Sequence, residues 1–328
     1  MAYNLAKKVL VFKKESVAGT PEALTDSDFD VRAREVEMTP DIQGGDEDSK
    51  YVTGDYGEDV AISGIQGASI TTMTKMATGS AIDQPPKWEK LAYGCGLVGQ
   101  SYAGTGYGWQ PLQQGDKQTL TMQKIEISDD GTPVGLASSF AGVMGNLTIG
   151  AENVGAPLKL SYELKGKFSG ISDVANGSIP VLTSPDATIS SKFMNGTATI
   201  WGQELCVQSF NFNLGNTIEY LPCPSESTGI LYSSIVNRQP RLTMTLITPP
   251  ASILNPFAEI TTEQEDAILL QAGDFTLEIP RGQILSYTET DLNGRMGYEL
   301  TIKCNRNAGA DPSLADESTF RLLLGSDS

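Results

Sequence analysis

The sequence contains no histidine in its 328 residues. Histidine is the commonest general base in enzymes and a very common metal ligand. Its absence excludes catalytic triads that use imidazole and zinc sites that carry it, although it leaves carboxylate chemistry open. Aromatic residues are also scarce, at 7%, and Trp88, Trp109 and Trp201 are dispersed along the chain. A carbohydrate-binding cleft normally needs more aromatic surface, so the composition disfavours one.

Cysteine pairs and long apolar runs are lacking as well. The four cysteines, Cys95, Cys206, Cys223 and Cys304, never stand at C-x-x-C spacing, so no zinc or redox site is predicted. Scattered thiols in a chain of this size fit a reducing compartment. No apolar segment approaches the length of a membrane-spanning helix or of a signal-peptide core. We therefore expect a protein that is made and kept in a cytoplasm, without membrane insertion.

Basic residues are few relative to acidic ones. The chain has 23 lysines and arginines against 40 aspartates and glutamates, which gives a formal net charge of −17. Binding to nucleic acid by phosphate neutralisation needs clustered basic side chains, so this mode of binding is not expected. Self-repulsion keeps such a chain soluble, and we expect a surface that does not adhere to DNA.

What the sequence has in abundance is alternation. Apolar side chains or threonines occupy every second position of six segments, at 68–76, 157–168, 210–214, 242–246, 275–279 and 298–304, and a further strand is predicted at 119–127. This pattern predicts strands with one face on a core and the other in water. Helical signals are confined to 87–95, which follows two prolines, and to 261–272, which a threonine can cap. The glycine-rich segments 41–59 and 94–115 are predicted to be long exposed loops.

The two halves of the chain show a faint internal repeat. The order strand, helix, strand, strand is predicted at 68–76, 87–95, 119–127 and 157–168, and again at 241–248, 262–272, 275–279 and 297–304. Tyr162-Glu163-Leu164 matches Tyr298-Glu299-Leu300 in residue type and phase. The shared order predicts two related β domains, residues 1–180 and 181–328.

Two patterns resemble binding sites without meeting their structural requirements. Gly94–Gly99 reads G-x-G-x-x-G, yet a dinucleotide site needs a strand before it and a helix after it, and here the predicted helix comes first. Asp26, Asp28, Asp30 and Glu37 have the spacing of calcium-loop ligands, but the loop lacks its central glycine and is better described as a strand with an acidic face. We predict no cofactor, no metal and no enzymatic activity; a hydrolase built on distant carboxylates is the enzymatic alternative.

Four segments carry a family resemblance when they are taken in order. Residues 13–21 read K-K-E-S-V-A-G-T-P, 205–221 contain F-x-F-x-L-G-N, 236–240 read V-N-R-Q-P before a strand, and 298–324 form a closing strand and turn. In this order, over roughly the whole chain, the sequence resembles the major tail tube proteins of long-tailed bacteriophages.

The resemblance implies a mostly β fold of antiparallel sandwich or barrel domains with a short flanking helix, duplicated along this chain. It implies a non-enzymatic virion protein, assembled in the cytoplasm of a bacterial host, whose stacked rings form the tail tube through which DNA is ejected. The implied partners are copies of the same chain, in trimeric pseudo-hexameric or hexameric rings, and the tape measure, terminator and distal tail proteins. DNA would transit without specific binding. A capsid decoration or baseplate protein is the alternative.

Two functional surfaces follow as hypotheses. One is a contact between stacked rings, made by an acidic loop and a basic N-terminal strand through salt-sensitive pairs. The loop residues are Asp46, Glu47, Asp48, Asp55, Glu58 and Asp59, and the basic residues are Lys7, Lys8, Lys13 and Lys14. The other is an acidic wall of the bore, which would repel DNA phosphates. Its candidates are Asp26, Asp28, Asp30, Glu163 and Glu299.

The stacking hypothesis predicts the outcome of a deletion. Removing residues 44–58 is expected to leave a folded, soluble subunit that no longer polymerises, because the acidic contacts are lost while the predicted strands remain. Electron microscopy of the purified variant would measure tube formation. Tubes of normal length would contradict the hypothesis.

Overall fold

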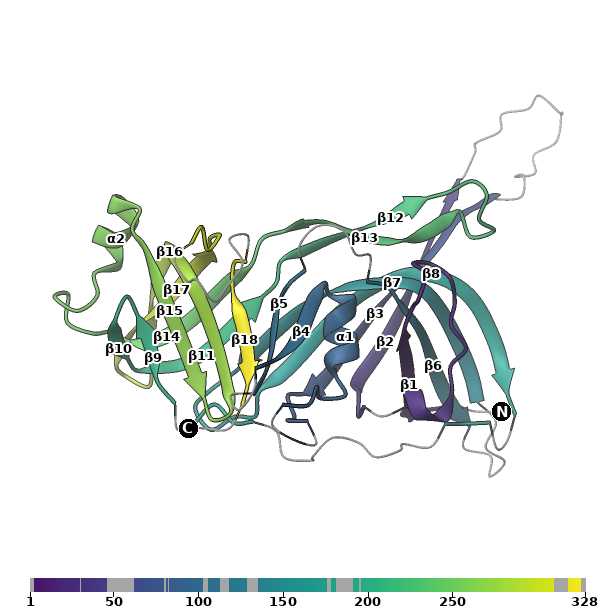
Figure 1. Ribbon diagram of the computed structural model, residues 1–328, viewed down its shortest axis with the longest axis horizontal. Coiled ribbons are helices and arrows are strands. Elements are labelled where there is room, and N and C mark those ends of the chain that lie inside the picture. The colour runs from purple at the N-terminus through teal and green to yellow at the C-terminus, as the bar shows by residue number, and fades with distance from the viewer. Residues whose placement is uncertain are drawn as a thin grey trace.

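The fold is almost wholly antiparallel β structure. A computed structural model describes residues 3–29, 31–45, 62–79, 81, 83–102, 106–112, 118–128, 135–175, 178–180, 191–194, 196–309 and 318–325. Within these residues sixteen strands belong to one sheet and two more form a separate hairpin, beside two short α-helices. The prediction of a mostly β fold is confirmed. The molecule is elongated, with the earlier half of the chain at one end and the later half at the other (Figure 1).

Six strands of the first half pair in the order β1–β6–β7–β8–β3–β2. The helix α1 (Glu89–Gly94) stands between β3 and β6 in the chain and lies beneath the arch of β7 and β8 (Figure 1). A small hairpin, β4 (Leu97–Tyr102) and β5 (Gly106–Pro111), follows α1. The six strands are β1 (Tyr3–Lys14), β2 (Arg34–Gly45), β3 (Ile62–Lys75), β6 (Leu120–Ser128), β7 (Gly135–Ala151) and β8 (Lys159–Val174).

Six strands of the second half pair in the order β9–β15–β16–β17–β14–β11. The helix α2 (Pro256–Thr262) stands between β14 and β15 in the chain. The six strands are β9 (Ala198–Ile200), β11 (Val207–Asn213), β14 (Arg241–Ile247), β15 (Glu265–Ala272), β16 (Phe275–Asp291) and β17 (Met296–Cys304). The remaining strands are β10 (Gln203–Leu205), the paired β12 (Asn216–Pro222) and β13 (Ile230–Arg238), and β18 (Arg321–Leu324).

The two halves share the same pairing order and a matching irregularity. In each half a helix precedes the three strands that follow one another as hairpins, β6–β7–β8 and β15–β16–β17. Lys165 in β8 and Thr301 in β17 each stand two residues after the matched glutamate. Each faces a residue at which the register shifts, Met144 in β7 and Ser286 in β16. Bulges are positioned features of a fold, so this coincidence supports the predicted relationship between the halves.

The two halves are joined by pairing between β11 and β7, from Phe210 opposite Ala151 to Asn213 opposite Thr148. The apolar side chains on one face of the joined sheet form the main core together with Trp88 and Trp109. The rings of these two tryptophans pack with centroids 4.7 Å apart. Burial of this face supplies the main driving force for folding. The opposite face carries a second, smaller apolar cluster of Val9, Val11, Ile125 and Ala137, and the β12–β13 hairpin covers part of it, where Lys167 is buried.

The helix predicted at 261–272 was wrong. Asn255 accepts a hydrogen bond from the main-chain N of Ala258 and Pro256 begins α2, so the helix starts five residues earlier. It ends at Thr262, because Glu263 adopts a left-handed conformation with φ 53°. Residues 265–272 form β15, in which buried and exposed positions alternate toward the end. The repeat therefore aligns 119–127 with 265–272 and not with 275–279.

Two further local predictions were wrong. The segment 94–115 is not one long loop, because β4 and β5 pair with each other from 97 to 111 and β5 also pairs with β18. The segment 26–33 is not a strand with an acidic face, because Asp26–Asp28 form a turn of 3-10 helix and β2 begins at Arg34. The helix at 87–95 is confirmed as α1.

Candidate assembly surfaces

The first motif of the family resemblance encloses a buried carboxylate. Glu15 is 8% exposed. Its oxygens accept hydrogen bonds from the main-chain N of Gly19 at 2.7 Å and of Gly142 at 2.8 Å, and from the hydroxyls of Thr119 at 2.6 Å and Thr121 at 2.9 Å. These four donors replace the hydrogen bonds to water that a carboxylate loses when it is buried. The carboxylate thereby ties the N-terminal loop to β6 and to the bulge of β7.

The two glycines of this cluster also receive the β12–β13 hairpin. A Cβ on Gly19 would lie 2.3 Å from the carbonyl oxygen of Leu231, and one on Gly142 would lie 2.7 Å from the Cβ of Tyr232. Both glycines have positive φ, 78° and 59°, which other residues rarely adopt. A hairpin from the second half of the chain therefore rests directly on the main chain of the first half.

The second and third motifs of the resemblance meet at the base of this hairpin. The side-chain amide of Asn216 donates to the carbonyl oxygens of Cys95 at 2.8 Å and Gly145 at 2.9 Å. Arg238 donates from Nε to the Asn216 Oδ1 at 2.8 Å and from Nη2 to the carbonyl oxygen of Gly96 at 2.9 Å. These bonds hold the hairpin against the end of α1 and against β7. Sequence reasoning missed this role, because the bonds to Cys95, Gly145 and Gly96 join residues at least 71 positions apart in the chain.

One face of the joined sheet, from β16 to β2, is polar, and we call it the polar face. In one row across it, Thr301, Thr243 and Asn211 lie on neighbouring strands, and the row continues through Gly150 to Lys159. Glu163 and Glu299, two of the predicted bore residues, both lie exposed on this face. The charged residues of the polar face are Glu37, Asp41, Lys75, Lys159, Glu163, Lys165, Lys167, Arg241, Glu299 and Lys303.

The polar face carries charges of both signs, and the expected acidic wall is not what the strands display. Lysines surround Glu163 on β8, and two of them have carboxylate partners. Lys159 lies 2.7 Å from Glu152 and Lys167 lies 3.1 Å from Glu226. The lysines are therefore partly neutralised within the chain, which weakens their attraction for phosphate.

Two other predicted bore residues, Asp26 and Asp28, do not join this face. Asp28 is buried, accepts hydrogen bonds from the main-chain N and the hydroxyl of Thr25, both at 2.9 Å, and lies 4.0 Å from Lys90. Asp26 is exposed in the same 3-10 turn, and Asp30 lies outside the described residues. Because the 3-10 turn holds Asp26 and Asp28, these two carboxylates do not form an acidic strand face.

The lysines proposed for ring stacking have partners in their own chain. Lys8 and Lys13 donate to main-chain carbonyl oxygens at 3.0 and 3.2 Å. Lys14 lies 3.2 Å from the carboxylate of Glu89. The side chain of Lys7 lies outside the described residues, as does the acidic loop with Asp46, Glu47, Asp48, Asp55, Glu58 and Asp59. The stacking contact stays a prediction.

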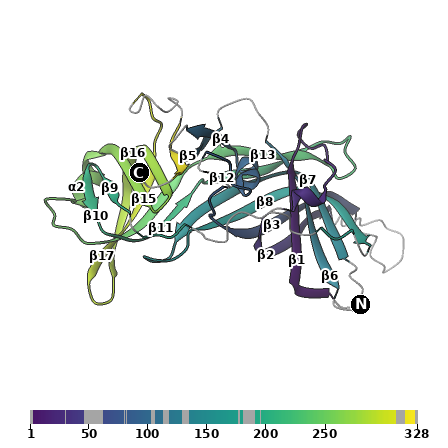
Figure 2. The ribbon, with the colours of Figure 1, turned by 60° about the horizontal axis from the view of Figure 1, so that its bottom comes forward.

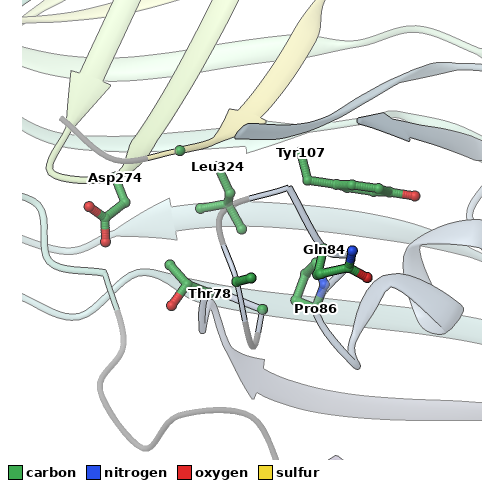
Figure 3. Close-up of a pocket in the computed structure, with 9 residues that line it drawn as sticks. Thr78, Gln84, Pro86, Tyr107, Asp274 and Leu324 are labelled. Carbon is green, nitrogen blue, oxygen red and sulfur yellow. The ribbon is translucent and has the colours of Figure 1, made fainter. Parts of the chain in front are cut away.

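A cleft of about 210 Å³ opens where residues 78–86 approach the end of β18. Figure 3 shows Tyr107 on one side of it and Asp274 on another. Burial raises the pKa of Tyr107 to about 12, so its phenol is neutral at pH 7. The other labelled lining residues, Thr78, Gln84, Pro86 and Leu324, are not titratable. Tyr107 and Asp274 are therefore the labelled titratable side chains at this cleft.

The thiols differ in their surroundings, and the glycine pattern does not form a dinucleotide-binding turn. All four cysteines are free, and burial raises the pKa of Cys95 and, to about 12, that of Cys304, so both are poor nucleophiles. Gly94 ends α1, Gly96 lies in the turn that follows, and Gly99 lies within β4. No group of three or more potential metal ligands occurs among the described residues. No helix in the same part of the chain has the length and apolarity to cross a bilayer.

The fold and these surfaces define a β-rich chain with one polar sheet face and open strand edges. No family profile matches the sequence. No curated protein matches it either.

The buried carboxylate predicts a stability effect. Glu15→Ala is expected to lower the free energy of unfolding by about 3 kcal/mol, because it leaves buried donors without their charged acceptor. Glu152→Ala, which removes an exposed carboxylate from a surface ion pair, should leave stability unchanged. Denaturant unfolding followed by circular dichroism would compare the two. Equal unfolding midpoints would show that the cluster around Glu15 contributes little.

Proposed function

We propose that this chain is the subunit of a bacteriophage tail tube, in which rings of the chain stack and the polar face lines the channel for DNA. The observation that carries the proposal is the single antiparallel sheet that runs from β16 through β7 to β2, with one polar face and strands left open. Open edges pair readily with other chains, and a closed ring leaves none of them exposed.

The duplicated pairing order favours trimeric rings. Each chain would supply two similar units, so three chains would give a ring of pseudo-sixfold symmetry. In the described part of the chain, β2 pairs only with β3, and β1 and β4 also have one partner each. These strands offer main-chain groups for contacts between chains. The β12–β13 hairpin already shows how one unit can cover its neighbour.

The charge on the polar face suits a surface along which DNA slides. A row of free lysines would hold phosphates through counterion release. On β8 the lysines share their face with Glu163, and two of them, Lys159 and Lys167, lie beside acidic partners. Together with a net charge of −17, this arrangement would limit retention of the passing DNA.

Reversing the charge of Glu163 and Glu299 tests whether the polar face lines the channel. In virions carrying Glu163→Lys and Glu299→Lys, tubes should form but DNA ejection should slow several-fold at low salt, because unpaired lysines would bind phosphate. Added salt should restore the rate. Glu204→Lys on β10, outside the polar face, is the matched control and should eject normally. A normal rate in the double variant would place these glutamates away from the channel.

Assembly of the purified chain separates the proposal from its alternative. Negative-stain microscopy at increasing concentration should show rings and then tubes of variable length. Closed particles of one fixed size would favour a capsid decoration or baseplate component. A monomer at every concentration and salt would contradict both.

A further inference from the structure

The junction between the halves shows how one unit accepts a strand from another. The pairing of β6 with β7 ends at Val143, and β11 takes over the same edge of β7, with Asn213 opposite Thr148. The main-chain N of Leu214 then donates to the carbonyl oxygen of Leu147 at 3.0 Å. As a result, residues 144–151 of β7 are buried or half-buried.

The matching edge of β16 has no such cover. The pairing of β15 with β16 ends at Gln283, and beyond it β16 pairs only with β17 in the described part of the chain. Most of residues 285–291 are exposed. Leu285 at 41% and Met296 at 50% are unusually exposed apolar side chains. The closed end of the β16–β17 hairpin projects from the body of the molecule (Figure 2).

The main-chain N–H and C=O groups of Glu289 and Asp291 point toward the open side of β16, where another strand could pair. Leu292 and Arg295 exchange two hydrogen bonds, of 2.7 and 3.2 Å, so Leu292 faces β17. Because residues of an antiparallel strand face their two neighbours alternately, Glu289 and Asp291 face the open side. Leu147 faces β11 in the same manner in the first half.

The strand that matches β11 is β2, and its outer edge is also open. Lys8 donates to the carbonyl oxygen of Val36, which caps only the beginning of this edge. Pro40 stands farther along, and proline within a sheet is confined to edge strands or bulges. In the chain itself β2 and the β16–β17 hairpin belong to opposite halves of the elongated molecule (Figure 1). They can meet only between chains.

The register follows from the matched glutamates. Thr71 lies opposite Glu163 and Thr245 lies opposite Glu299, so their partners on the next strand, Glu37 in β2 and Ser209 in β11, occupy equivalent positions. Four residues further along each strand, Asp41 is equivalent to Asn213. On the other side, Asn146 faces Glu163 and Thr288 faces Glu299. Thr290 therefore stands where Thr148 stands, two residues later.

We infer that β2 of one chain pairs antiparallel with the open edge of β16 in the next chain, with Asp41 opposite Thr290, and that this repeats the β11–β7 junction and closes the ring. The inference rests on the proposed ring assembly and names its contact. The neighbouring chain would also shield Leu285 and Met296, whose counterparts in the first half are covered.

A cysteine pair tests the register. Asn213 and Thr148 are opposite one another without exchanging hydrogen bonds, since Leu214 and Leu147 take the adjacent bonded position. Such pairs have Cα atoms about 4.5 Å apart, within disulfide range. Asp41→Cys with Thr290→Cys, in a background of Cys206→Ser and Cys223→Ser, should form under oxidation a reducible ladder of covalent oligomers that ends at the ring size.

The control shifts one cysteine by a single residue. In Asp41→Cys with Asp291→Cys the second thiol points to the opposite face of β16, and no ladder should form. In a separate variant, Glu289→Pro removes an outward N–H without touching the β16–β17 bonds. It should abolish rings while the circular dichroism spectrum and melting temperature stay near those of the parent chain.

The outcomes separate this inference from the proposed function. Suppose that microscopy shows rings of the parent chain. The β2–β16 contact would then be overturned by any of three results: no ladder, equal ladders from both cysteine pairs, or normal assembly of Glu289→Pro. The tube proposal would still stand. Absence of rings and tubes in the parent chain at every concentration would overturn both.

Discussion

Main-chain hydrogen bonding at strand edges is the constraint on which the rest of this structure depends. Every strand offers N–H and C=O groups on two sides, and each side must meet a partner or water. Within the chain, β11 satisfies the edge of β7 where β6 ends. That pairing turns two similar units into one sheet, whose main core lies on one side.

The contacts between the two units are unlike ordinary surface contacts. The buried carboxylate of Glu15 organises the loop and the bulge that carry Gly19 and Gly142, and the β12–β13 hairpin packs on those glycines. Asn216 and Arg238 bind carbonyl oxygens at the end of α1. Three of the four motifs behind the family resemblance therefore serve one purpose, which is to fasten one unit to the other. The same type of junction, repeated between chains, would build a ring.

Local sequence patterns predicted the fold class well and the irregular parts poorly. Alternation at 157–168 and 298–304 corresponds to β8 and β17, since one face of each strand is buried and the other is wet. The segment 265–272 misled the prediction, because acidic residues followed by an apolar run suit a helix start as well as a strand. Pairing with β9 and β16 decided in favour of the strand. Such long-range pairing leaves no mark in the local pattern.

The sequence by itself determined which side chains alternate, where the matched Tyr-Glu-Leu triplets lie and that the chain is strongly acidic. These properties are local or additive, so they can be read without a fold. Only the tertiary structure decided that Glu163 and Glu299 share one face, that Asp28 turns inward and that β16 keeps an open edge. Those outcomes depend on the register between strands far apart in the chain, and register is set by the packing of the whole sheet.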